Sequence, residues 1–128
     1  MKITINNRIR FGEDTELISE THDCNMKQKG DFVYLMYQNG DAEKVVIKFN
    51  HTEMTMSRFS NPQSIMKFFA GKKALIALPT PMGIQQFLTD TQFYSYQEKQ
   101  QTLELCYALL QANTEAVFAT YELKITWS

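Results

Sequence analysis

Apolar and polar residues alternate with a period of two along most of this chain, starting at its second residue. In the segment from Lys2 to Phe11, one face of an extended strand collects the apolar side chains Ile3, Ile5, Ile9 and Phe11. The chain ends on the same period, with Tyr121, Leu123, Ile125 and Trp127 on one face. This period is typical of strands with one buried side. Because the first and last segments are both patterned strands, the sequence predicts one antiparallel sheet that curls shut to hide its edges.

Turn-forming residues divide the chain at strand-length intervals. After the first segment, the predicted strands cover residues 32–37, 44–49, 52–59, 63–69, 74–78, 83–89, 93–96, 103–111 and 117–127. The Asn39-Gly40 pair favours a type I′ hairpin turn, and 83–89 with 93–96 are predicted to form a hairpin-like pair. Periodicity does not decide between helix and strand over 96–113. We favour the strand at 103–111, and a short helix over 96–101 stays open.

Composition favours one small domain. The 128 residues are 44% hydrophobic and 12% aromatic, which is enough for a single core over residues 1–128. The net charge of −1 argues against general binding to nucleic acid or to anionic membranes. We expect no secretory leader and no membrane insertion, because the first residues alternate polar and apolar and no apolar run is long enough to span a bilayer, so a cytoplasmic location is expected. In that compartment Cys24 and Cys106 are expected to be thiols that pack as small hydrophobes.

Four short motifs carry a resemblance that extends over nearly the whole chain. They are Arg58, Met66-Lys67-Phe68-Phe69-Ala70-Gly71, Thr80-Pro81-Met82-Gly83 and Leu103-Glu104-Leu105-Cys106-Tyr107. In this order and spacing the chain resembles the YwiB-like family, small bacterial proteins of unknown function. The resemblance implies an up-and-down calycin-type barrel like that of lipocalins. It implies no activity and carries over no functional residue.

Catalytic and metal-binding signatures do not emerge from the sequence. It contains no nucleophile elbow, phosphate loop, zinc-protease motif or paired-cysteine motif, so no catalytic residue and no cofactor are predicted. His22, Cys24 and Met26 would line one face of a strand with ligands acceptable to a soft metal. However, side chains on one strand stand about 7 Å apart, and we therefore predict no metal site there.

The middle strands are rich in methionine, which suits either an ordinary core or a surface that adapts to apolar ligands. The interior of a small barrel can be filled by side chains or can hold one small ligand. If a cavity exists, the interior candidates for contact with a ligand are Met54, Met56, Arg58, Met66, Phe68 and Tyr107.

Arg58 is the most informative single residue, because alternation places it on the same face as Met54 and Met56. A buried guanidinium needs partners. One candidate partner is a ligand carboxylate, which the guanidinium can bind bidentately. The other is a set of strand-end carbonyls, with Arg58 acting as a latch that closes the barrel base. We favour the latch, since a buried charge without a protein partner would destabilise the empty barrel.

The sequence as a whole predicts an all-β, antiparallel, up-and-down barrel of about eight to ten strands. The leading functional hypothesis is a non-enzymatic binding protein for a small apolar or amphipathic molecule, such as a lipid-like acid. The alternative is an interaction or structural module with a packed interior that uses an outer face or the corner at Pro79 to Gly83. An enzyme is the weakest of the three hypotheses. The oligomeric state is not indicated.

Overall fold

The computed structural model describes residues 1–128 as ten β-strands without a helix. The strands are β1 (Lys2–Phe11), β2 (Asp14–Lys29), β3 (Phe32–Gln38), β4 (Lys44–Phe49), β5 (Glu53–Phe59), β6 (Ser64–Phe69), β7 (Lys73–Thr80), β8 (Gly83–Gln97), β9 (Thr102–Gln111) and β10 (Val117–Trp127). The predicted all-β class is confirmed, and so is the predicted strand at 103–111. No helix has the length and apolar content needed to cross a membrane.

All ladders are antiparallel, and they run in the order β6-β5-β4-β3-β2-β1-β10-β9-β8-β7. The first and last strands pair as predicted, with Ile3 opposite Trp127 and Ile5 opposite Ile125. The meander is therefore closed everywhere except between β6 and β7, which share no ladder. The Thr89 hydroxyl of β8 donates a 2.6 Å hydrogen bond to the Lys67 carbonyl of β6 beside this gap. The result is a nearly closed up-and-down barrel.

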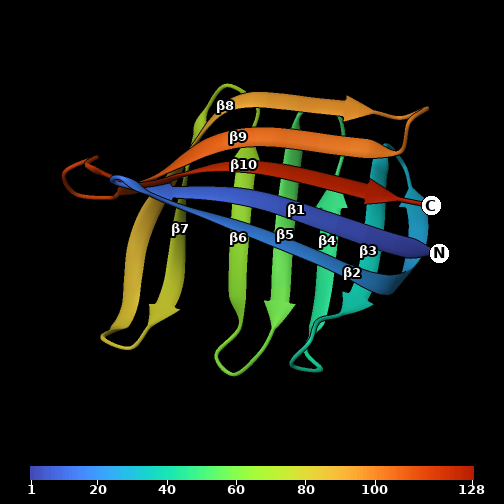
Figure 1. The fold of residues 1–128 in the computed structure, drawn as a ribbon, viewed down its shortest axis with the longest axis horizontal. Coiled ribbons are helices and arrows are strands. Elements are labelled where there is room, and N and C mark those ends of the chain that lie inside the picture. Colours follow the sequence, from blue (N-terminus) through green and yellow to red (C-terminus); the bar gives the residue numbers. More distant parts are fainter.

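Two layers of strands cross each other in the barrel (Figure 1). Strands β2, β1, β10, β9 and the later part of β8 run across one layer, and β3 to β7 run across the other. The long strand β2 belongs to both layers. Its residues 14–23 pair with β1, and its residues 24–29 pair with β3. The two chain ends lie close together at one side of the barrel.

The core consists of two clusters of different size. Seventeen buried residues form the larger cluster, whose fully buried members include Phe49, Phe68, Ile3, Leu35, Ile47, Met54, Leu103, Leu105 and Ile125. Ile76, Phe87 and Leu109 form the smaller cluster. The partly buried side chains Met66 and Tyr121 pack against both clusters. Side chains therefore fill most of the barrel interior.

Polar contacts tie the β4–β5 turn to the opposite layer. The Asn50 side-chain carbonyl accepts hydrogen bonds from the backbone N–H groups of Thr52 and Glu53, both at 3.0 Å. The Tyr94 hydroxyl of β8 reaches the carbonyls of Asn50 and Glu53 at 2.8 and 2.7 Å. A hydroxyl has only one proton, so the two carbonyls share it.

Two local predictions are wrong, and one alternative that the sequence left open does not occur. The β3–β4 connection is a five-residue loop, Asn39 to Glu43, in which Ala42 and not Gly40 takes a positive φ of 59°. Residues 83–97 form one strand instead of a hairpin-like pair, with a bulge between Thr91 and Phe93. The bulge shifts the alternation, because it lets Thr91 and then Tyr94 face inward. Residues 98–101 form a turn, so there is no short helix over 96–101.

Candidate functional site

A pocket of about 330 Å³ lies at one end of the barrel, where β5 ends and β6 begins. Its lining comes from six strands and the β3–β4 loop: Glu20, Tyr37, Asn39, Val45, Met56, Arg58, Ser64, Met66, Leu78 and Pro79. We call it the mouth pocket. It exists because β6 and β7 do not pair and because β2 leaves one layer for the other at this end.

The wall of the mouth pocket is apolar. Met56 and Met66 are direct cross-strand partners on β5 and β6. Met56 packs against the larger core cluster, Leu78 against the smaller one, and Met66 against both. The pocket therefore lies in the incompletely filled space between the two clusters. Thioether side chains can adapt to different apolar shapes at such a place.

Arg58 stands at the rim of the pocket. It pairs with Ser64 across β5 and β6, and its side chain is 52% exposed. Its one close charged neighbour is Glu43, with 3.9 Å between Arg58 Nε and Glu43 Oε1. That distance is too long for a good hydrogen bond. Most of the guanidinium donors therefore remain free to bind a ligand.

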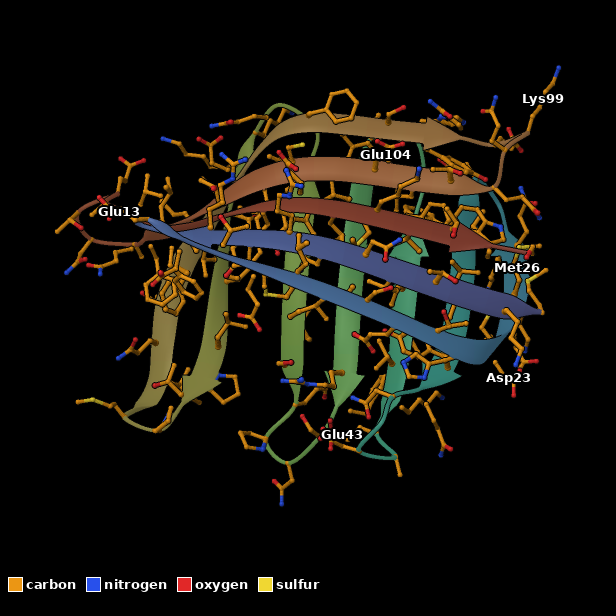
Figure 2. All side chains as sticks on the ribbon, in the orientation of Figure 1. Glu13, Asp23, Met26, Glu43, Lys99 and Glu104 are labelled. Carbon is orange, nitrogen blue, oxygen red and sulfur yellow. The ribbon has the colours of Figure 1, made fainter.

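The β3–β4 loop fixes the position of Glu43. The Asn39 side-chain carbonyl accepts hydrogen bonds of 3.0 Å from the backbone N–H groups of Asp41 and Glu43. Asn39 Nδ2 also donates to Glu43 Oε1 at 3.0 Å. Figure 2 shows Glu43 at the lower end of the layer formed by β3 to β7, below β2, which crosses in front of that layer. The Glu43 carboxylate thus already accepts a hydrogen bond from Asn39, so its interaction with Arg58 is weaker.

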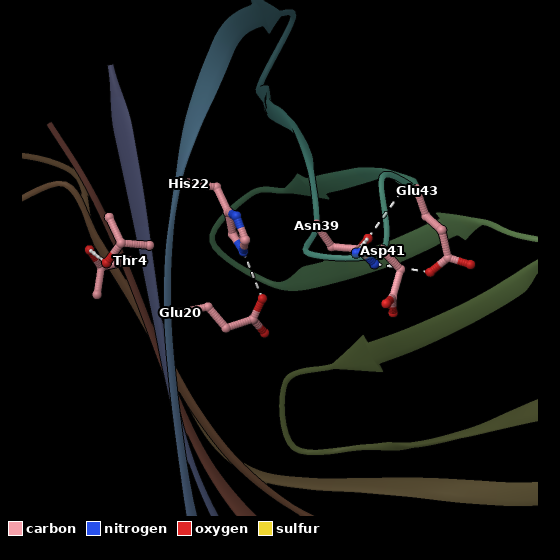
Figure 3. A network of polar contacts seen from close by, with 7 residues as sticks. Thr4, Glu20, His22, Asn39, Asp41 and Glu43 are labelled. Carbon is pink, nitrogen blue, oxygen red and sulfur yellow. Dashed lines mark hydrogen bonds and ion pairs between the residues drawn. The ribbon is translucent and has the colours of Figure 1, made fainter.

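A second polar group faces the pocket from β2. His22 Nε2 lies 2.8 Å from Glu20 Oε1, and the His22 ring stacks on Tyr37 with 5.1 Å between centroids. In Figure 3 both Glu20 and His22 point from β2 toward the loop that carries Asn39 and Glu43. Polar side chains from β2 and from the loop thus approach the mouth from two sides.

Burial controls the protonation of Tyr37. It raises the pKa of the Tyr37 phenol far above the ordinary value, the nearby Glu20 carboxylate raises it further, and Arg58 opposes the shift. The phenol therefore stays neutral throughout the physiological range. In that state it can donate one hydrogen bond to a ligand in the pocket.

The predicted interior residues fall into two groups. Met56, Arg58 and Met66 line the mouth pocket together. The other three are core residues: Met54 and Phe68 are almost fully buried, and Tyr107 stacks on Tyr121 with 4.5 Å between centroids. These three side chains fill space in the barrel instead of lining the pocket.

The predicted latch at Arg58 is wrong. Alternation assigned Arg58 to the inner face correctly, but β5 ends one residue later, at the open end of the barrel. The side chain is half exposed, and its one close polar contact is to the Glu43 carboxylate at 3.9 Å and not to a strand-end carbonyl. The argument from a buried charge therefore does not apply.

Sequence reasoning missed Glu20, Tyr37 and Leu78. The inner face of β2 is mostly polar between Glu16 and His22, so the pattern gives no amphipathic signal for that segment. Tyr37 continues the alternation of Val33 and Leu35 and could have been assigned to the interior. Leu78 could not, because its role depends on how β7 approaches β6.

The two cysteines and the His22-Cys24-Met26 segment behave as ordinary parts of the fold. Cys24 is buried, Cys106 is half-buried, and both are free thiols. Burial is the main cause that raises the pKa of each thiol. Met26 is 41% exposed, while His22 is engaged by Glu20 and Tyr37.

Larger depressions exist on the molecule, but they are more open. One of about 630 Å³ extends over outward-facing residues such as Arg8, Glu104 and Glu122. Another of about 740 Å³ lies between β2 and the β3–β4 hairpin. The first depression also places a cation beside apolar residues, and that cation, Arg8, lies 3.9 Å from Glu122. The mouth pocket is the better candidate because it is more enclosed and its wall of Met56, Met66 and Leu78 packs directly against the core clusters.

The fold and this pocket define a small antiparallel β-barrel with one amphipathic mouth. Residues 3–125 match the family described as Domain of unknown function (DUF1934), and the chain belongs to that family.

Among solved structures, the chain is similar to the crystal structure of ywiB protein from Bacillus subtilis, with a TM-score of 0.77 and 14% identity. The similarity covers 99% of this chain and 90% of that one, and it confirms the barrel fold and the predicted YwiB-like resemblance. No curated protein matches the chain.

Proposed function

We propose that the protein is a non-enzymatic binding protein whose mouth pocket takes a small amphipathic acid. One observation carries this proposal. A half-exposed arginine with a single charged neighbour, at 3.9 Å, stands at the rim of a pocket walled by Met56, Met66 and Leu78.

An acidic head group suits Arg58. The pocket lining contains one cation, Arg58, and one carboxylate, Glu20. Glu20 is already held by His22 at 2.8 Å. A ligand carboxylate can offer Arg58 two short, parallel hydrogen bonds, which the Glu43 contact does not provide. It would therefore replace that contact with a stronger one.

The rest of the ligand is apolar and short. A volume of about 330 Å³ is near the lower end of the range for small-molecule pockets. The buried side chains of the larger core cluster block a deeper path into the barrel. These features favour a medium-chain or aromatic acid over a long acyl chain.

The alternative is an interaction module with a packed barrel. It is supported by the well-filled interior and by the exposed side chains Met82 and Ile84 at the β7–β8 corner, which are 86% and 72% exposed. We favour ligand binding because the mouth pocket lies outside the packed cluster. The two free thiols support a location in the reducing cytoplasm, which we propose with the same function.

Calorimetric titration of delipidated protein tests the proposal. Decanoate should bind at one saturable site, and Arg58→Met should weaken it by about 1.5 to 3 kcal/mol through loss of a charged hydrogen bond. Decanol, which lacks the charge, should bind both proteins equally. Arg10→Met is the matched control, because Arg10 is exposed on β1 and does not line the mouth pocket. Absence of binding by decanoate, decanol and aromatic acids would favour the interaction module.

A further inference from the structure

The first half of β2 is a free sheet edge. Residues 14–23 pair with β1 on one side, from Phe11 opposite Asp14 to Lys2 opposite Asp23. On the other side, β3 pairs only with the second half of β2, from Cys24 onward. Backbone groups along about ten residues therefore have no neighbouring strand.

The register shows which backbone groups are free. The Cys24 N–H donates to the Met1 carbonyl at 2.9 Å, so Cys24 directs its backbone toward β1. In an antiparallel ladder, alternate residues bond to the same neighbour. The even-numbered residues of this segment therefore bond to β1. Thr15, Leu17, Ser19 and Thr21 direct their N–H and C=O groups to the open side.

This edge lacks several common protections against strand addition. Between Asp14 and Asp23 there is no proline, no lysine and no break in register. Leu17 is 71% exposed and Ile18 is 37% exposed. The edges of β6 and β7, by contrast, carry Lys67, Lys73 and Pro79.

The acidic side chains of residues 14–23 favour a basic partner strand at this edge. The segment contains Asp14, Glu16, Glu20 and Asp23 but no lysine or arginine. Lys2 of β1 pairs with Asp23 at 2.6 Å and His22 contacts Glu20, so Asp14 and Glu16 are the carboxylates without an ion-pair partner. Two copies paired antiparallel through this edge would bring their acidic residues near one another, which destabilises a cross-strand pairing. A partner with lysine or arginine would instead place opposite charges across the strands.

We infer that the free edge of β2 binds an extended, basic peptide segment of another protein as an additional antiparallel strand. In Figure 1, the free edge of β2 is its lower edge, opposite β1, and strands β4 to β7 of the other layer extend below it. The added strand would therefore lie over the mouth pocket, which Glu20 lines. The inference goes beyond the proposed function and does not depend on it. The free groups of Leu17, Ser19 and Thr21 belong to residues outside that pocket.

Two synthetic peptides of about eight residues test the inference, one alternating lysine with valine and one alternating glutamate with valine. The readout is amide hydrogen exchange by nuclear magnetic resonance, with and without peptide. The lysine peptide should bind saturably and slow the exchange of the Thr15, Leu17, Ser19 and Thr21 amides. The glutamate peptide should bind at least tenfold more weakly.

Two variants at one position separate edge pairing from general charge attraction. Ser19→Pro removes one free N–H without touching the ladder to β1, and it should weaken the lysine peptide about tenfold. Ser19→Ala keeps the N–H and should bind as the parent does. Leu17→Lys places a cation on the edge and should also weaken binding of the lysine peptide. This variant provides the test if Ser19→Pro is unstable.

Unchanged binding by both Ser19→Pro and Leu17→Lys, or protection of other amides only, would overturn the inference. Concentration-dependent protection of the edge amides without peptide would assign the edge to a second copy instead. Decanoate titration of Ser19→Pro keeps the two proposals apart, because this variant retains every residue of the mouth pocket.

Discussion

At the scale of single residues, exposure separates side chains that hold the barrel together from side chains that are free to bind. Met54 and Arg58 lie on the same face of β5, yet the first is almost fully buried and the second is half exposed. Each residue is one position from an end of β5, so the difference comes from what surrounds each end: Met54 belongs to the larger core cluster, whereas Arg58 lines the mouth pocket. A pattern of alternation gives the face of a residue but not its depth.

Replacement of Arg58 separates the latch from a binding role. Arg58→Met should change the free energy of unfolding of the ligand-free protein by less than about 0.5 kcal/mol, because an exposed pair at 3.9 Å contributes little. Denaturant unfolding of the delipidated proteins, with Arg10→Met as the control, measures this. A loss of several kcal/mol at Arg58 alone would restore the latch.

Buried tyrosines should make the barrel sensitive to alkali. Burial raises the pKa of Tyr37, Tyr94 and Tyr107 far above the ordinary value. The folded state then keeps these protons while the unfolded state loses them above about pH 10. Stability should therefore be intact below that pH and fall as pH rises, by about 1.4 kcal/mol per pH unit for each such tyrosine.

Two tyrosine variants test this account with urea unfolding at neutral and alkaline pH. Tyr107→Phe should be close to neutral at pH 7, since its hydroxyl makes no side-chain hydrogen bond, and should reduce the alkaline loss. Tyr94→Phe removes the contacts to the Asn50 and Glu53 carbonyls and should cost about 1 to 3 kcal/mol at pH 7. Equal effects of the two variants at pH 7 would contradict the assignment.

At the scale of elements, the period of two predicts most strands, but it does not predict the connections or β2. The strands at both chain ends follow from Ile3, Ile5, Leu123 and Ile125, which are all buried as predicted. The inner face of β2 is mostly polar between Glu16 and His22, and Glu20 on this face lines the mouth pocket. The pattern therefore fails in a segment that contributes to the candidate site.

The pairing of β1 with β10 gives a direct test of the assigned faces. Ile5 is 5% exposed and lies opposite Ile125, so Ile5→Asp should destabilise the protein by several kcal/mol through burial of an unpaired charge. Thr4→Glu, one residue earlier on the outer face, should be nearly neutral. Thermal unfolding of both variants decides, and equal shifts in the midpoint would mean that the faces are wrong.

The β3–β4 loop gives a second test at this scale. A type I′ turn at Asn39-Gly40 needs positive φ at both residues, whereas here the positive φ is at Ala42. Gly40→Ala should therefore be neutral or stabilising by up to about 1 kcal/mol, and Ala42→Gly should also stabilise by relieving the left-handed conformation. Chemical denaturation measures both changes. A clear loss of stability in Gly40→Ala would support the type I′ turn.

At the scale of the whole molecule, the barrel combines a filled interior with one unclosed side. The long strands β2 and β8 change partners along their length. Strands β6 and β7 do not pair with each other. The opening and the free edge of β2 therefore arise from the same topology. The sequence predicts a closed sheet because its ends pair. It cannot predict the gap, which depends on non-local packing between β6 and β7. A calycin relationship remains a prediction.

The most direct test of the proposed function is a crystal structure of the delipidated protein with a medium-chain acid that carries bromine at its far end. We expect the anomalous signal of bromine between Met56, Met66 and Leu78, with the carboxylate hydrogen-bonded to the Arg58 guanidinium in place of its contact with Glu43. Bromine bound only elsewhere, or no bound acid at saturating concentration, would contradict the account.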